Sequence, residues 1–220
     1  MIMLNIILST LLFFWFKREI SLFHYRTHKN IYNEMNSVIN LKFSLNQFIK
    51  ESTITRKNCT KEIVILPLLI FIPLYFQHKS ENIILISMIL VYLSLLDYTY
   101  YLTEIKYIGI IFTLSLIHTL TNDKVNIDSN ITCLLFTIIF FISFNYIAEW
   151  VIQREAIGFG DILLLIALSP LFTIEGIALL LFIASLAGIV FYEGYYLYKK
   201  ERLSKLPFIP FITIGFILTI

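Results

Sequence analysis

The sequence predicts an all-α, polytopic integral membrane protein with about eight (seven to eight) transmembrane helices. Hydrophobic residues make up 58% of the 220 positions, with 20 Phe and 13 Tyr, and only 15% of the residues are charged. The mean hydropathy of +0.81 is far above that of a chain with an ordinary water-exposed surface. The apolar residues also form solid blocks rather than the short alternating segments of a membrane β-barrel.

Eight apolar blocks define the predicted helices. Several blocks are shorter than the roughly 20 residues that a perpendicular span requires, so their flanks must complete the helices. The blocks are residues 1–16, 63–76, 83–96 (continuing through 98–102), 107–120, 131–152, 162–172, 177–192 and 208–220.

The placement of positive charge predicts an external N-terminus. If the chain alternates from an external Met1, its internal stretches hold all the Lys and Arg residues except Lys79 and Lys124. This skew is the one that the positive-inside rule requires, so the basic residues reflect topology and do not indicate a nucleic-acid partner. The internal stretches are residues 17–62, 103–106, 153–161 and 193–206.

Three regions follow from this topology. Residues 1–16 are expected to be an uncleaved membrane anchor, because Lys17 and Arg18 follow the apolar block and no small-residue cleavage site is present. Residues 17–62 form a polar cytoplasmic loop whose single cysteine, Cys59, has no partners at metal-ligand spacing. We therefore expect no metal and no cofactor there. Residues 63–220 form the membrane-embedded region.

The most informative stretch is Gly158-Phe159-Gly160-Asp161, which is followed at once by an apolar run. Glycine can adopt positive φ values, so the chain is expected to turn sharply and place Asp161 in the first turn of a helix. A simpler interpretation is that Asp161 is only the N-cap of that helix.

A second acid, Asp97, lies near the inner end of another predicted helix. From Ile83 to Thr103 that helix is about 31 Å long, and Asp97 is its only carboxylate. An acid at such a depth usually has a function or a partner, although Asp97 could also be an interfacial residue that extends toward the lipid headgroups. The topology puts Asp97 and Asp161 at one level on the cytoplasmic side. Paired carboxylates are what an aspartic peptidase needs.

These elements, with Pro207-Phe208-Ile209-Pro210-Phe211 before the last helix, resemble the type IV prepilin peptidase family of membrane aspartyl peptidases. The resemblance runs from about residue 63 to the C-terminus. It implies that Asp97 and Asp161 are catalytic, and that the motif positions support them. Those supporting positions are Gly158, Gly160, Pro207, Phe208 and Pro210.

The resemblance also implies partners and location. The substrates would be prepilins or prepilin-like proteins, cut at the cytoplasmic face of the bacterial plasma membrane between a basic leader and a hydrophobic helix. The enzyme would be multi-pass, with the lipid bilayer as its surroundings, and no nucleic acid would take part.

The chain departs from the family pattern at three places. The family often has Lys two residues after the second aspartate, where this chain has Leu163, and often Pro soon after the first, where it has Leu102-Thr103-Glu104. Many members carry two zinc-binding cysteine pairs in the cytoplasmic loop, and residues 17–62 do not. Because the family's N-methyltransferase activity is associated with that N-terminal region, we expect this chain to cleave without methylating.

Two other classes of function remain open. A presenilin-type intramembrane peptidase also uses Gly-x-Gly-Asp, but it requires Pro-Ala-Leu where this chain has Pro207-Phe208-Ile209. A non-enzymatic membrane protein, either a proton-coupled carrier or an inactive peptidase relative, is the other alternative. A carrier should show polar residues and helix breaks near the middle of the membrane, whereas the two acids here are predicted near its inner face.

Overall fold

A computed structural model describes residues 2–39, 44–52, 68–122, 126–153, 157–201 and 205–220, and all the regular structure in these ranges is helical. The predicted all-α class is therefore confirmed for the described residues. The chain divides into two compact units, Met1–Pro73 and Leu74–Ile220. Cys59 and the first five residues of the predicted block 63–76 lie outside the described residues.

The first unit contains α1 (Ile2–Ile39) and α2 (Leu45–Glu51), which pack against each other. Helix α1 continues without a break through Lys17 and Arg18, so the end of the apolar block does not end the helix. Helix α2 begins after Ser44, whose backbone N–H donates to the Gln47 side chain at 2.9 Å. The short helix α3 (Leu68–Tyr75) spans the division between the two units.

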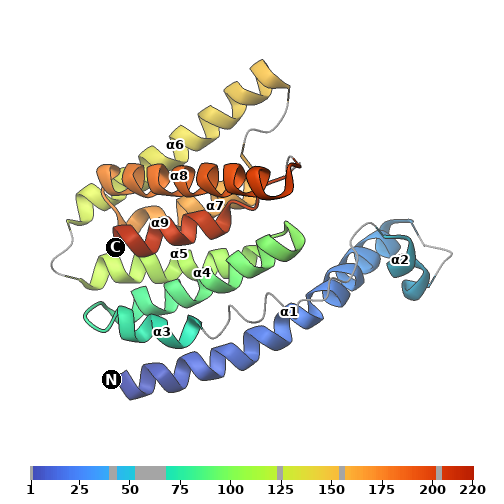
Figure 1. The fold of residues 1–220 in the computed structure, drawn as a ribbon, viewed down its shortest axis with the longest axis horizontal. Helices are drawn as coiled ribbons and strands as arrows, with labels where there is room; N and C mark the ends of the chain where they lie inside the picture. Colours follow the sequence, from blue (N-terminus) through green and yellow to red (C-terminus); the bar gives the residue numbers. More distant parts are fainter. Residues whose placement is uncertain (1, 40–43, 53–67, 123–125, 154–156, 202–204) are drawn as a thin grey trace. The chain divides into compact units, whose positions relative to one another are not determined.

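Within its described residues the second unit holds six further α-helices, each of which lies in one of the predicted apolar blocks or overlaps most of it (Figure 1). Helix α7 continues into a short 3-10 turn, η2, that contains Pro170. The helices are α4 (Glu81–Tyr100), α5 (Ile105–Thr121), α6 (Ile127–Ile152), α7 (Phe159–Leu168) with η2 (Ser169–Leu171), α8 (Ile174–Lys199) and α9 (Ile209–Thr219).

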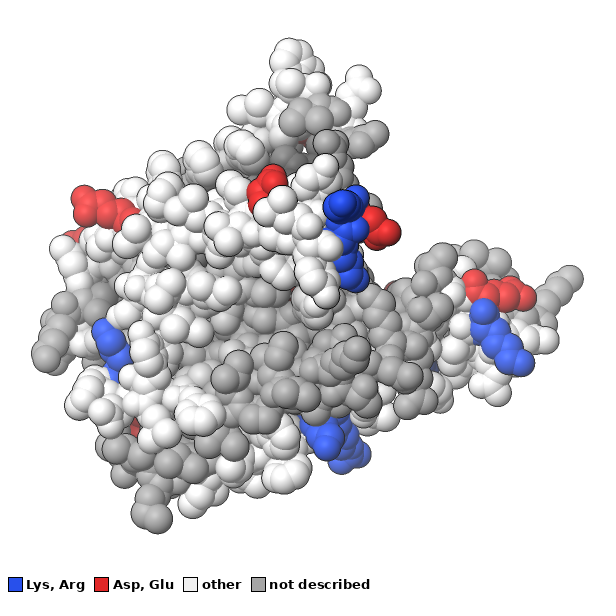
Figure 2. Space-filling model, in the orientation of Figure 1, with Lys and Arg blue, Asp and Glu red and all other residues white. Residues whose placement is uncertain are grey.

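Three of these helices, α4, α6 and α8, are long and apolar enough to cross a membrane, and α5, α7 with η2, and α9 are shorter apolar helices. Among the described residues on the face drawn in Figure 2, white surface predominates over the blue and red of charged side chains. Such a surface suits a lipid environment. Eight spans and an external N-terminus remain predictions.

Helix α4 forms the centre of the second unit. Helices α5 and α9 pack against it, α8 packs against α9, and α7 packs against α5. In the most apolar 18-residue stretch of α4, 72% is buried, whereas only 22% is buried in the corresponding stretches of α6 and α8. Helices α6 and α8 therefore present most of their surface to the surroundings. Close packing of α8 on α9 depends on Gly215, because a Cβ there would lie 2.7 Å from the Leu180 carbonyl oxygen.

Carbonyl groups at the C-terminal end of α7 and in η2 accept hydrogen bonds from side chains of neighbouring helices. Ser115 Oγ donates to the Ala167 carbonyl at 2.7 Å. Thr119 Oγ1 and Asn130 Nδ2 donate to the Pro170 carbonyl at 2.6 and 2.7 Å. These contacts satisfy carbonyl groups that a helix end would otherwise leave unpaired in apolar surroundings.

Consecutive helices of this unit alternate in direction (Figure 1). The segments that follow α4, α6 and α8 therefore lie at one end of the bundle. The opposite end is held by contacts such as that of Ser80 Oγ with His118 Nδ1 at 2.9 Å, between the start of α4 and the end of α5. The first end carries the stretches that the sequence analysis marked as functional.

Candidate active site

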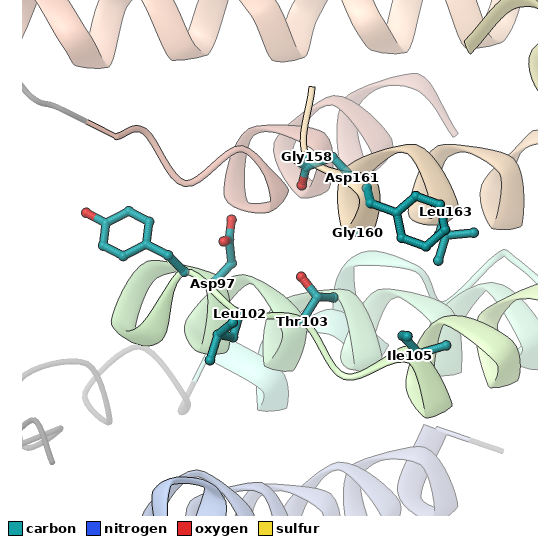
Figure 3. A pocket seen from close by; sticks show the side chains of 10 residues that line it. Asp97, Leu102, Thr103, Ile105, Gly158, Gly160, Asp161 and Leu163 are labelled. Carbon is teal, nitrogen blue, oxygen red and sulfur yellow. The ribbon is translucent and has the colours of Figure 1, made fainter. Parts of the chain in front are cut away.

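Asp97 and Asp161 line one cavity of about 300 Å³. Figure 3 shows the segment around Asp97 and Thr103 on one side of this cavity, and the turn from Gly158 to Asp161 on the other. The structure thus brings together the two acids that the sequence analysis paired. The remaining lining residues are Tyr101, Leu102, Thr103, Ile105, Gly158, Phe159, Gly160 and Leu163.

Asp97 lies in the last turn of α4, and only 7% of its surface is exposed. Its Oδ2 accepts a hydrogen bond from the Ile209 backbone N–H at 3.1 Å. Ile209 is the first residue of α9, so the donor is one of the N–H groups that a helix leaves free at its N-terminus. The alternative interpretation, in which Asp97 extends toward the headgroups, is therefore wrong, because the side chain points into the bundle.

Helix α9 is held in place beside Asp97 by a second contact with α4. Ser94 Oγ and Thr213 Oγ1 are 2.6 Å apart, and Thr213 Oγ1 also donates to the Ile209 carbonyl at 3.0 Å. Both residues lie one turn from the contact between Asp97 and Ile209. The hydroxyl pair therefore fixes the register of α9 against α4, and with it the position of the donor.

The predicted proline motif forms the entry to α9. Phe208 precedes the helix, and its carbonyl accepts the N–H groups of Phe211 and Ile212 at 3.0 and 3.1 Å. Pro210 lies in the first turn, where its missing N–H costs no helical hydrogen bond. Pro207 is buried just before this turn. The motif residues thus build the helix start from which Ile209 reaches Asp97.

Asp161 lies in the first turn of α7, as expected, and it is partly buried. Gly158, not Asp161, is the N-cap of the helix, and the Asp161 backbone N–H donates to the Gly158 carbonyl at 3.0 Å. The simpler interpretation of Asp161 as a cap is therefore wrong. Its carboxylate is free to face the cavity.

The expectation that the two glycines adopt positive φ is also wrong. Gly158 has a φ of −60°, and no glycine in the described residues has a positive φ. Both glycines instead allow a close approach. A Cβ on Gly158 would lie 3.2 Å from Asp161 Oδ2, and a Cβ on Gly160 would lie 2.9 Å from Thr103 Oγ1. The motif needs glycine to make room for an acid at one position and for a hydroxyl at the other.

Several cavity residues were not selected as site residues from the sequence. Thr103 and Leu163 stood out only as departures from a family pattern, and Phe159 only as the variable position of the Gly-x-Gly-Asp element. Tyr101 and Ile105 carried no signal. The position of Thr103 six residues after Asp97, at the end of the helix that the sequence predicts over 83–103, was the available clue. Among the described residues that line the cavity none is Lys, Arg or His, so the walls around the two acids are mostly apolar.

The fold and the cavity place the protein in a class of apolar helical proteins in which two carboxylates from separate helices share one site. The family model described as "Type IV leader peptidase family" matches residues 84–192, a stretch that contains Asp97 and Asp161. This part of the chain belongs to that family, which confirms the resemblance seen in the motifs. The match ends before Pro207. No curated protein and no solved structure matches the chain.

Proposed function

We propose that this protein is an aspartic endopeptidase that removes the leader peptide of type IV prepilins or prepilin-like proteins. The observation that carries the proposal is the shared cavity of Asp97 and Asp161, both inside the segment that matches the leader peptidase family. The apolar walls contributed by Leu102, Ile105 and Leu163 suit a substrate whose cleavage site adjoins a hydrophobic helix.

In the proposed reaction the pair holds one proton in the resting enzyme. The ionised acid takes a proton from a water molecule while the water oxygen attacks the scissile carbonyl carbon, and the protonated acid gives its proton to the carbonyl oxygen. The resulting tetrahedral intermediate loses its C–N bond as a proton passes to the amine nitrogen. The products are a carboxylic acid and a new N-terminus, and the pair again holds one proton.

The proposed orientation places this chemistry at the cytoplasmic face of a bacterial plasma membrane. Its support is the concentration of Lys and Arg in stretches that lie on one side of an eight-span topology with an external N-terminus. In this arrangement residues 1–16 are the anchor, residues 17–62 the cytoplasmic loop, and residues 63–220 the peptidase region.

We also propose that the protein does not N-methylate the residue that cleavage exposes. The support is the composition of the loop 17–62, which has one cysteine, Cys59, and no metal-ligand spacing. Mass spectrometry of the processed substrate tests this proposal. A mature N-terminus heavier by one methyl group, and dependent on this chain alone, would contradict it.

The test of the peptidase assignment is co-expression with a prepilin-like substrate that carries a C-terminal tag, followed by measurement of its mass. Asp97→Asn and Asp161→Asn should each abolish cleavage while leaving membrane insertion intact, because acid and base roles contribute about 10² to 10⁴ each. Asp128→Asn is the matched control, because Asp128 is an exposed acid in the first turn of α6. Normal cleavage by either of the first two variants would remove the pair from the reaction.

A further inference from the structure

Thr103 is a polar side chain of the cavity to which no role has been assigned. It belongs to the short segment between α4 and α5, is partly buried, and lines the cavity together with both acids. In Figure 3 its hydroxyl points from this segment toward the α7 turn that carries Gly160 and Asp161. Its side chain therefore lies within the space that a substrate would occupy.

Two neighbours fix the position of Thr103. On one side, the α7 backbone at Gly160 approaches so closely that a Cβ there would be 2.9 Å from Thr103 Oγ1 and 3.2 Å from Thr103 Cβ. On the other side, the adjacent Glu104 accepts a hydrogen bond from Tyr92 at 3.1 Å and an ion pair from Lys106 at 3.3 Å. These contacts restrain the segment that carries Thr103, and its branched side chain has few χ1 rotamers.

The Thr103 hydroxyl makes no hydrogen bond to any of the described residues. Most serine and threonine hydroxyls of the bundle return a hydrogen bond to a carbonyl three or four residues earlier, as Thr99 does to Leu95 at 2.7 Å. Thr103 follows the end of α4, and its hydroxyl makes no hydrogen bond to an earlier backbone carbonyl of the described residues. Its oxygen faces the cavity. Its hydrogen-bonding capacity is available to a molecule bound there.

We propose that Thr103 is a further catalytic residue, whose hydroxyl donates a hydrogen bond to the oxygen of the scissile carbonyl as the tetrahedral intermediate forms. This inference rests on the proposed peptidase function. The hydroxyl transfers no proton, so the balance of the hydrolysis is unchanged. A donor in a largely apolar cavity, whose described lining residues include no Lys, Arg or His, stabilises developing charge more than it would in water.

The test compares two substitutions that differ only in the hydroxyl. Thr103→Val keeps the branched shape and removes the donor, whereas Thr103→Ser keeps the donor and removes a methyl group. With purified full-length protein and a prepilin-like substrate, Thr103→Val should lower kcat about 10- to 100-fold with KM nearly unchanged. Thr103→Ser should restore most of kcat. Thr113→Val is the control, because the exposed Thr113 hydroxyl bonds only to the Ile110 carbonyl of its own helix.

Each outcome supports or overturns the inference. A Thr103→Val variant with kcat within twofold of the unchanged protein overturns it, as does a Thr103→Ser variant that is equally impaired, or a loss confined to KM. If the Val variant does not accumulate in membranes, Thr103→Ala provides the same comparison with the Ser variant. Absence of any cleavage by the unchanged protein overturns the peptidase function itself, together with this inference.

Discussion

Gly160→Ala tests whether the close approach of α7 to the α4–α5 segment sets the geometry of the site. The new Cβ would lie 2.9 Å from Thr103 Oγ1, which is about half an ångström inside ordinary contact at 3.4 Å. The Cβ of Thr103 is also only 3.2 Å away, so the side chain cannot avoid the clash by rotating about χ1. The α7 turn and the segment must therefore separate, and Asp161 moves with its helix.

A misplacement of about 1 Å can cost roughly 10²-fold in rate, so a shift of half that size should lower kcat about 10-fold. The assay is cleavage of a tagged prepilin-like substrate by purified protein. Gly109→Ala is the matched control, since nothing lies within 4 Å of a Cβ at that position of α5. Gly109→Ala controls for the gain in helix propensity, and thermal unfolding of both variants separates a displaced site from weaker folding caused by the overlap at Gly160. Equal activity of the two variants would refute the reasoning.

Three further outcomes are expected. Gly215→Ala should lower stability in detergent by about 1–3 kcal/mol, because its Cβ would lie 2.7 Å from the Leu180 carbonyl oxygen. Gly194→Ala should not lower stability, because nothing lies within 4 Å of a Cβ at that position. Thermal unfolding measures both variants, and equal midpoints would contradict the close packing of α8 on α9. Ser94→Ala and Thr213→Val should show a coupling energy of about 0.6 kcal/mol in a double-mutant cycle, and strictly additive effects would argue against the hydroxyl contact. Cleavage should survive chelators, and metal analysis of the purified protein should find no stoichiometric zinc; one zinc per chain lost together with activity would show that a metal takes part.

The helices of the second unit could be predicted because a membrane allows few alternatives. Apolar blocks must satisfy their own backbone hydrogen bonds, so each block from residue 83 onward becomes a helix. The ends were less predictable, since hydropathy does not determine where a helix stops. The block 177–192 belongs to a helix that runs from Ile174 to Lys199, because its Tyr-rich continuation remains helical although it is less apolar.

The site could be predicted only where a local pattern carried it. Asp161 follows from the Gly-x-Gly-Asp element, and its place in the first helical turn was correctly expected. The reason for the glycines was wrong, because the neighbour that requires Gly160 is Thr103, 57 positions earlier in the chain, and no local rule reports a contact over that distance. The same holds for Ile209, whose N–H reaches Asp97 across 112 positions.

Each of the two acids lies at the start of a helix. Asp161 lies in the first turn of α7, and Asp97 accepts the N–H of the first residue of α9, so the N-terminal ends of two helices meet the carboxylates at this cavity. Each such end carries a partial positive charge of roughly half an elementary unit, together with backbone N–H donors. The described lining residues include no cation, and of the two helix ends that of α9 donates a backbone hydrogen bond to a carboxylate, from Ile209 to Asp97. The helix ends are fixed by the backbone, so they need no reorganisation as charge moves between the acids and the substrate. The proline motif before α9 is therefore as much a part of the site as the Gly-x-Gly-Asp element, since each builds one of the two helix starts.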